Sequence, residues 1–359
     1  MTENSIKFGI LGCAQIARKV SRAIHLSPNS TLYAIGSRSI EKANKFAADN
    51  GFPETVKIYG SYNEVLNDPD VDAVYMPLPT TLHVHWGVLA AEKKKHLLLE
   101  KPTALSVADL DLILEACRAN GVQFMDGSMW LHHPRTAKMK DMLRDTQLFG
   151  QLNSIHSTST FSETEEFFDD NIRVKPDLDS LGALGDVGWY CIGAILWATD
   201  YKLPKTVCTL PKLTCNQQGV ILACGASFDW GEDGKAATFY CSFLSNVSMD
   251  LVLYGTNGSI HLEDFTIPYE ESSASCDLSS GANFAELQVG WTVKPVKVQV
   301  ASELPQEALM VQEFARLVEN IKKNGKSPDG KWPEISRKTQ LVLDAVGKSI
   351  ELGCKPVDI

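Results

Sequence analysis

Residues 6–17, IKFGILGCAQIA, decide the fold of this chain. The apolar run 6–11, broken only by one lysine, predicts a strand, and apolar side chains at helical spacing follow it. In the fingerprint G-x-G-x-x-G/A, the three small positions are Gly12, Ala14 and Ala17. Glycine permits the tight turn, and the free N–H groups of the helix that follows attract a pyrophosphate. The stretch therefore predicts a dinucleotide-binding turn, with Ala14 as a departure from the usual middle glycine.

The same alternation of strand and helix continues to about residue 127. Further strands are expected at residues 31–36, 71–76, 96–99 and 122–125. Between them, helices are expected to begin after Ser39, Ser61 and Ser106, which can cap them, and around Leu82. Alternation at this spacing requires right-handed crossovers, so we expect an α/β fold with a doubly wound parallel sheet.

The pattern changes after residue 127. A helix is expected at 134–144 and an alternating strand at 152–161, and strand-like runs separated by turn signals occupy 205–298. These runs predict an open, mostly antiparallel sheet. The polar segment 271–281, ESSASCDLSSG, predicts a mobile loop, and two amphipathic helices are expected near 305–323 and 336–352. Because 359 residues exceed what one core usually serves, we expect two domains, 1–127 and 128–359.

Composition excludes several classes of protein. The net charge is −10, from 34 basic and 44 acidic residues, which disfavours nucleic-acid binding. No apolar run approaches the ~20 residues of a membrane helix. The nine cysteines contain no C-x-x-C and the histidines have no ligand spacing, so we expect neither a disulfide framework nor a metal site. With no signal-peptide pattern in residues 1–7, we expect a reducing, cytoplasmic location.

The end of the second predicted strand indicates which dinucleotide binds. Folds that bind NAD usually carry an acid there, whereas this chain has Ser37-Arg38-Ser39. A guanidinium can pair with a 2′-phosphate and the serine hydroxyls can donate to it, which predicts NADP rather than NAD. The alternative is a solvated loop arginine.

Two further segments carry side chains that could take part in catalysis. Lys101, in Glu100-Lys101-Pro102, follows the strand at 96–99 and would point into the crevice where parallel sheets bind ligands. Asp186 and Tyr190 are four residues apart and would share a helix face, as proton transfer requires. The alternatives are a surface Glu–Lys pair, a capping aspartate and a core tyrosine.

Together these residues resemble the Gfo/Idh/MocA oxidoreductase family over essentially the whole chain. The resemblance is carried by residues 9–17, 37–42, 75–83, 90–102, 126–134 and 184–197. Glu-Lys-Pro followed by Asp-x-Gly-x-Tyr is specific in this order. The terminal tyrosine, Tyr190, is similar to the branch with dimeric dihydrodiol dehydrogenase, NADP-dependent xylose dehydrogenase and glucose–fructose oxidoreductase. One departure is Leu131-His132, where many members carry Arg-Phe.

The resemblance implies a Rossmann domain followed by an α/β domain whose open sheet carries a substrate pocket and a homodimer interface. It implies that Lys101 and Tyr190 are catalytic, with Asp186 beside them. The cofactor residues it implies are Gly12, Ala14, Gln15, Ile16, Ser37, Arg38, Lys42, Pro77, Leu78, His83, Glu100 and Lys101. The substrate residues are Trp130, Phe161, Asp186 and Tyr190, with Trp291 also expected to shape the pocket.

The resulting hypothesis is hydride transfer between NADP and a secondary alcohol or hemiacetal carbon of a sugar, polyol or cyclic diol. Oxidation needs a base, and a phenol with a pKa near ~10 is a poor one unless a cation such as Lys101 favours the phenolate. Tyr190 is therefore the expected acid–base group, and Asp186 orients the substrate or the lysine. The alternatives are a non-catalytic NADP(H)-binding regulator and an NAD-linked inositol or sugar dehydrogenase.

Overall fold

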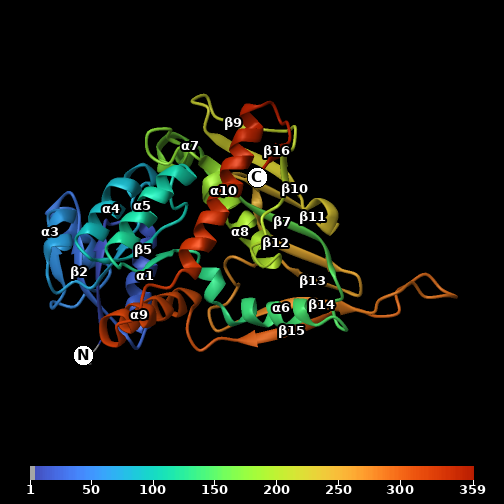
Figure 1. Cartoon of the computed structure of the whole chain (residues 1–359), viewed down its shortest axis with the longest axis horizontal. Helices are drawn as coiled ribbons and strands as arrows, with labels where there is room; N and C mark the ends of the chain where they lie inside the picture. The colour runs from blue at the N-terminus through green and yellow to red at the C-terminus, as the bar shows by residue number, and fades with distance from the viewer. Residues whose placement is uncertain (1–4) are drawn as a thin grey trace. The chain divides into compact units, whose positions relative to one another are not determined.

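The computed structural model describes residues 5–359. The prediction that residues 1–7 contain no signal-peptide pattern therefore falls partly outside the described residues. The chain divides into two compact units (Figure 1). The first unit comprises Met1–Met129 and Leu304–Arg337, and the second comprises Trp130–Glu303 and Lys338–Ile359. This division differs from the expected single boundary at residue 127, because a late segment of the chain returns to the first unit.

The first unit contains a parallel sheet. Its strands are β1 (Ile6–Leu11), β2 (Ser30–Gly36), β3 (Lys57–Tyr59), β4 (Ala73–Met76), β5 (His96–Leu99) and β6 (Phe124–Asp126). Over residues 5–359, these six strands pair only in parallel, in the order β3-β2-β1-β4-β5-β6. The order reverses direction between β1 and β4, as in doubly wound folds that bind ligands at this point. The predicted parallel α/β sheet is confirmed.

Three helices of the first unit begin where the sequence predicts serine caps. The helices of this unit are α1 (Gln15–Leu26), α2 (Ile40–Asp49), α3 (Tyr62–Asn67), η1 (Thr80–Leu82), α4 (His83–Glu92), α5 (Val107–Ala119) and α9 (Gln306–Asn324). Ser39, Ser61 and Ser106 each accept a hydrogen bond from the backbone N–H three residues later, at the start of α2, α3 and α5. These local bonds explain why the boundaries could be predicted.

Long-range contacts explain why residues 304–337 belong to the first unit. Helix α9 packs on α1, where Ser27 Oγ donates to the Ala308 carbonyl at 2.8 Å, and the Phe314 ring lies 5.9 Å from Phe8 of β1. Helix α10 (Lys331–Glu351) contains the division between the units. In its first part, Ser336 donates a hydrogen bond to the buried carboxylate of Asp126, at the end of β6.

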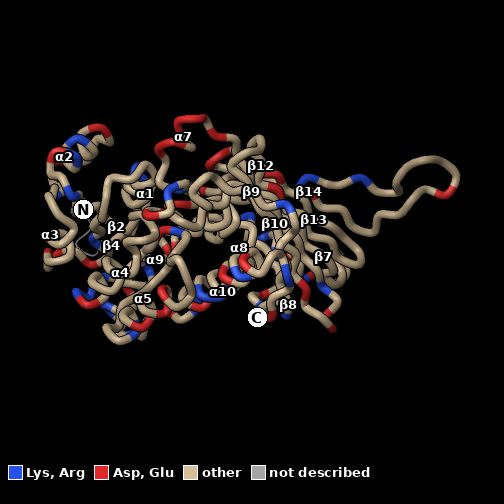
Figure 2. The backbone as a smooth tube through the Cα atoms, turned by 90° about the horizontal axis from the view of Figure 1, so that it is seen from above, with Lys and Arg blue, Asp and Glu red and all other residues tan. Residues whose placement is uncertain are grey.

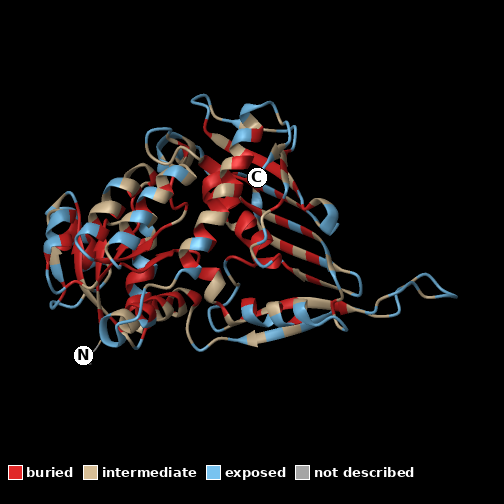
Figure 3. Ribbon diagram, viewed as in Figure 1, coloured by how far each residue is buried: buried red, intermediate tan, exposed pale blue. Residues whose placement is uncertain are grey.

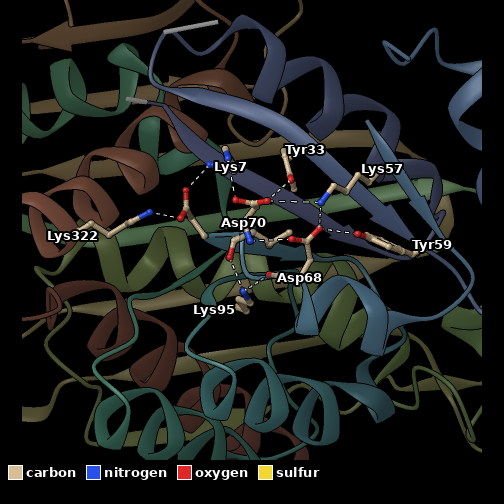
Figure 4. Close-up of polar contacts among 10 residues, drawn as sticks. Lys7, Tyr33, Lys57, Tyr59, Asp68, Asp70, Lys95 and Lys322 are labelled. Carbon is tan, nitrogen blue, oxygen red and sulfur yellow. Dashed lines mark hydrogen bonds and ion pairs between the residues drawn. The ribbon is translucent and has the colours of Figure 1, made fainter. Parts of the chain in front are cut away.

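A cluster of polar and charged side chains lies near the amino ends of the strands of this sheet, opposite their carboxyl ends (Figure 4). Before β4, Asp68 accepts from Lys57 and Tyr59 at 2.8 and 2.7 Å. Lys95 is buried and donates to the carbonyl oxygens of Asp68 and Val71, both at 2.7 Å. Burial lowers the pKa of Lys95. The cluster fixes the loop before β4, so these charges have a structural role.

The second unit contains the larger sheet. Its strands are β7 (Leu152–Ser162), β8 (Thr206–Thr209), β9 (Thr214–Cys215), β10 (Ile221–Asp229), β11 (Ala236–Ser242), β12 (Leu244–Gly255), β13 (Gly258–Leu262), β14 (Ser273–Ser280), β15 (Val296–Ala301) and β16 (Val357–Asp358). In the described chain the order is β15-β14-β13-β12-β7-β11-β10-β8-β16, with β9 beside β10. Neighbours are antiparallel except β7 and β11, which confirms the predicted mostly antiparallel sheet.

Helices cover one face of this sheet and leave the other open. They include α6 (Pro134–Arg144), α7 (Glu165–Asp170), η3 (Ile172–Val174), η4 (Leu184–Gly188) and α8 (Trp189–Ala198), with the short turns η2 (Met129–His132) and η5 (Gly231–Asp233) elsewhere. Helix α8 packs on β7 and β11 over a core that includes Phe239 and Leu253. On alternate positions of the central strands, His156, Tyr240 and Tyr254 are exposed. Figure 3 shows buried and exposed residues alternating along the strands of this sheet. We call this second side the open face.

The predicted mobile loop at 271–281 is wrong. Most of it forms β14, which pairs with β13 and β15. Ala274 and Cys276 are buried at alternate positions, while Ser273 and Ser275 beside them are only partly covered. The segment has the period-2 pattern of a strand, but its apolar side is made of small residues that a polarity count overlooks.

Candidate functional site

The fingerprint turn has the geometry of an anion site. Gly12 has a φ of +110°, and a Cβ there would lie 3.0 Å from the Leu78 side chain, so only glycine fits without strain. Ala14 is the extended N-cap of α1; within residues 5–359 no side chain caps it, and the first turn carries no acid. The free N–H groups around Gln15 and Ile16, at the start of the helix, can therefore bind a pyrophosphate. The turn thus fits a dinucleotide.

The loop after β2 gathers the residues predicted to select the dinucleotide. Burial raises the pKa of the Tyr62 phenol, at the start of α3, and the nearby positive charge of Arg38 partly opposes this rise. The Lys42 backbone N–H donates to Ser39 Oγ at 3.2 Å. Tyr62 was missed by sequence reasoning, because it lies 24 positions beyond Arg38 and outside any motif.

The loops after β4 and β5 are joined by His83. Its Nε2 lies 2.8 Å from the Leu78 carbonyl oxygen and its Nδ1 lies 3.1 Å from that of Thr103. The ring is buried, which lowers its pKa. Both ring nitrogens therefore face protein carbonyls, so His83 positions the loop that contains Pro77 and Leu78. Its predicted direct contact with a cofactor stays a prediction.

Glu100 is held at the end of β5 by unpredicted neighbours. The Tyr75 hydroxyl donates to Glu100 Oε1 at 2.5 Å, and the Lys101 backbone N–H donates to Oε2 at 3.2 Å. A Cβ at Gly127 would lie 2.9 Å from Oε1, so a glycine is needed beside the carboxylate. Burial raises the pKa of Glu100. Lys101 follows at once, half-buried, and its peptide bond to Pro102 is cis.

In the second unit, Asp186 and Tyr190 lie one turn apart. Asp186 is in the π-helical turn η4 and is buried, whereas Tyr190 is half-buried in the first turn of α8. A Cβ at Gly188, between them, would lie 3.3 Å from the Cys241 sulfur, so this glycine allows the turn to pack closely on β11. The structure thus places the predicted acid and phenol on one continuous helical segment.

Arg173 is the residue of this unit that sequence reasoning missed. Its Nε lies 2.9 Å from Asp186 Oδ2. Asp186 is the main cause that raises the pKa of Arg173 above its usual range, and Asp179 and Tyr190 add to it. The one sequence signal is an arginine that follows the acidic stretch 163–170. Arg173 therefore interacts electrostatically with both Asp186 and Tyr190.

The three aromatic residues predicted to line a pocket are not gathered together. Trp130 is buried in the core of the second unit, with ring centroids 6.1 Å from Trp197 and 5.8 Å from Phe265. Phe161 stacks at 4.9 Å on Phe243 and meets Phe167 of α7. Trp291 lies on an exposed hairpin. Of the three, Phe161 packs against the α7 segment that leads to η3 and Arg173.

Other site types have no support in the described residues. In residues 5–359 no three His, Cys, Asp or Glu side chains are grouped so as to hold a metal ion. The nine cysteines are free thiols. None of the described helices is both long enough and apolar enough to cross a bilayer.

Comparison with known proteins identifies both halves of the chain. A model of the Gfo/Idh/MocA oxidoreductase family, described as an NAD-binding Rossmann fold, matches residues 6–128. A model of the Gfo/Idh/MocA C-terminal domain matches residues 136–261. The first match ends and the second begins between residues 128 and 136, where the first sheet ends and the segment leading to the second sheet begins.

Individual proteins agree with these models. An uncharacterized oxidoreductase from Rhizobium meliloti is 29% identical over 97% of this chain and 98% of its own. A D-xylose 1-dehydrogenase (NADP(+)) from Haloferax volcanii is 37% identical, over 52% of this chain and 55% of its own. The crystal structure of an aldose-aldose oxidoreductase from Caulobacter crescentus, complexed with glycerol, superposes with a TM-score of 0.82. At 21% identity, over 99% of this chain and 100% of that one, the likeness shows the fold.

Proposed function

This chain belongs to the Gfo/Idh/MocA oxidoreductase family, and on that premise we propose that it transfers a hydride between NADP and a secondary alcohol or hemiacetal carbon of a sugar, polyol or cyclic diol. One observation carries the proposal. The fingerprint turn, Leu78 and Lys101 follow β1, β4 and β5, three neighbouring parallel strands whose carboxyl ends form the ligand edge of this fold. The Haloferax relative, named for D-xylose and NADP(+), supports the substrate class and the cofactor.

The chain offers residues for each part of the dinucleotide. The N–H groups around Gln15 and Ile16 would hold the pyrophosphate, and Ser37, Arg38 and Lys42 would hold a 2′-phosphate. Glu100 and Lys101 would lie at the nicotinamide end. When bound, the nicotinamide supplies the redox chemistry, so the protein must supply orientation and a path for the proton.

Replacing Arg38 by Ala is expected to weaken NADPH binding ~10–100-fold and to change NADH binding less than ~2-fold, because a charge-assisted hydrogen bond contributes ~1.5–3 kcal/mol. Fluorescence titration with both cofactors measures the two Kd values. Arg118→Ala is the matched control, since that arginine pairs with Glu115 on the exposed side of α5. Equal losses for both cofactors would contradict the phosphate role and favour the NAD alternative.

The proton of the substrate hydroxyl has a defined route in this proposal. Tyr190 takes it as general base in oxidation and returns it as general acid in reduction. Lys101 acts with Tyr190 on the same substrate, because an ammonium favours the phenolate over the phenol. Asp186 orients the substrate or the lysine. The carboxylate of Asp186 is already held at 2.9 Å by Arg173, which makes Arg173 a positioning residue.

Replacing Arg173 by Gln is expected to lower kcat ~10-fold and to move the acidic limb of kcat/KM to higher pH, because Asp186 loses the cation that stabilises its charged form. A full pH profile measures both effects. Arg173→Lys should restore most of the activity and return the limb toward its original pH. Arg144→Gln is the control, since Arg144 pairs with Asp200 at an exposed site. A fall in activity with no change in the pH profile would contradict the role of Arg173.

A turnover panel tests the function itself. Purified protein would be assayed by NADPH absorbance with NADP or NAD and with aldoses including D-xylose, polyols and trans-dihydrodiols. Turnover of at least one class with NADP is expected. Binding of NADPH without turnover of any compound would favour the non-catalytic regulator instead.

The proposal extends to assembly and location. We propose a homodimer formed through the open face, where Tyr240 and Tyr254 are exposed aromatic side chains. Such side chains grouped on a sheet are typical of an interface. We also propose a reducing, cytoplasmic location, which nine free thiols favour.

A further inference from the structure

A hairpin extends beyond the large sheet between β14 and β15. We call residues 281–295, GANFAELQVGWTVKP, the arm. Its two sides are joined by an isolated bridge between Phe284 and Trp291 and by hydrogen bonds from Ala285 N–H to the Gly290 carbonyl at 2.9 Å and from Thr292 N–H to the Asn283 carbonyl at 2.8 Å. Figure 1 shows the arm continuing the direction of β14 and β15 past the end of the sheet. Hydrogen bonds within the arm therefore hold its two sides together.

The arm presents apolar side chains that its own chain does not cover. Phe284 is 81% exposed and Trp291 67% exposed, and Leu287 and Val289 are 99% and 108% exposed. The two aromatic rings contact each other edge to face, with centroids 6.1 Å apart, and most of their surface is open to solvent. An apolar patch of this size on a single chain marks an interaction site.

We propose that the arm packs against the open face of a second copy of this chain. This inference rests on the proposed homodimer and names the element that stabilises it. Within one copy, the arm extends past the ends of β14 and β15 at the edge of the sheet, whereas Tyr240 and Tyr254 lie on the central strands β11 and β12. In a second copy, the same exposed side chains are available to it.

The charges of the arm favour an apolar protein partner. Between residues 281 and 293 the charged side chain is Glu286, and lysines follow at the base of the arm (Figure 2). Lys294 is the one basic residue of the arm, and the acid Glu286 near its tip together with the net charge of −10 opposes binding to an anionic membrane surface. The open face carries the exposed tyrosines Tyr240 and Tyr254, against which apolar side chains of the arm can pack.

The area of the arm suits a two-fold dimer. Each buried aromatic side chain covers roughly 150–250 Å². In a two-fold dimer the arm of each copy packs on the other copy. The two arms together therefore contribute four aromatic and four aliphatic side chains. A standard interface buries about 1,600 Å² in total, so the arms would supply a large share and the open faces would supply the rest.

The decisive variant replaces the four apolar side chains together: Phe284→Ser, Leu287→Ser, Val289→Ser and Trp291→Ser. Because all four are exposed, folding should be unchanged, which circular dichroism checks. Sedimentation velocity over a wide concentration range is expected to show a dimer for the unmodified chain and a dissociation constant raised on the order of 100-fold for the variant. The matched control, Glu286→Gln with Gln288→Asn, keeps the apolar side chains and should leave the dissociation constant unchanged.

A double-mutant cycle tests where the arm binds. Trp291→Ala and Tyr254→Ala are expected to weaken the dimer by less together than the sum of their separate effects, because each removes the same contact. Strictly additive effects would overturn the assignment to the open face.

The possible failures are distinguishable. A monomeric unmodified chain would overturn the arm proposal and the homodimer together. A dimer whose dissociation constant is unaffected by the four substitutions would overturn the arm alone. Co-flotation with phosphatidylserine-containing vesicles, lost in the variant, would assign the arm to a membrane instead. NADPH titration and the turnover panel report on the enzymatic proposal independently of all three.

Discussion

Replacing Tyr190 by Phe is expected to lower kcat at least ~100-fold while the Kd for NADPH changes less than ~2-fold. The substitution removes one hydroxyl and keeps the ring, so the packing of α8 should survive. If Tyr190 carries the substrate proton, its loss leaves no group to accept it during oxidation. Cofactor binding should be unaffected, because the residues proposed to hold the dinucleotide belong to the first unit.

The measurements are steady-state turnover with the best compound of the panel and a fluorescence titration with NADPH. Tyr269→Phe is the matched control, since it removes the same hydroxyl from an exposed tyrosine of the second unit. The pH profile adds a second readout, because the limb that reports the acid–base group should disappear in the variant. Unchanged turnover would remove Tyr190 from the mechanism.

The second large effect concerns stability. Arg135→Met is expected to lower the free energy of unfolding by about 3–5 kcal/mol, the usual cost of removing one partner of a buried ion pair. Arg135 lies on α6 and is buried beside Asp264, with which it forms an ion pair. Its guanidinium also donates to the Asp264 carbonyl at 2.8 Å and to the Ser275 carbonyl at 3.0 Å. One side chain thus fastens α6 to β14 and to the loop before it.

Urea denaturation followed by tryptophan fluorescence measures this loss, because five of the seven tryptophans lie in the second unit. Arg144→Met is the control on the same helix. Arg144 pairs with exposed Asp200, so its loss should cost less than ~1 kcal/mol. Adding Asp264→Asn to Arg135→Met should recover part of the lost stability, because the uncompensated charge is then gone. A loss below ~1 kcal/mol for Arg135→Met would contradict the structural role.

The parts of the fold that the sequence predicted well depend on neighbouring residues. The strand His96–Leu99 and the helix Pro134–Arg144 have the predicted bounds, and the three serine caps make the expected bonds. In each case the deciding interaction spans a few residues, so the pattern is visible in the sequence. The same holds for Gly12, whose positive φ follows from the turn that the fingerprint requires.

Interactions between distant residues were not predictable in this way. The segment 271–281 is polar enough to indicate a loop, yet it is a strand because β13 offers an edge and Arg135 binds the Ser275 carbonyl. Similarly, the run Lys93-Lys94-Lys95 contains one lysine that is buried on the carbonyls before β4. Neither partner lies within a local window of the sequence.

The candidate site divides along the same line. The fingerprint turn, the Ser37-Arg38 pair and the helical spacing of Asp186 and Tyr190 could be predicted from local sequence, because backbone geometry over a few residues sets them. Contacts between distant segments reveal that Arg173 holds Asp186, that Arg38 lies near Tyr62 and that residues 304–337 join the first unit. These contacts arise when segments far apart in the chain bury their side chains against each other, and the energy of that burial depends on surroundings that no short stretch of sequence specifies.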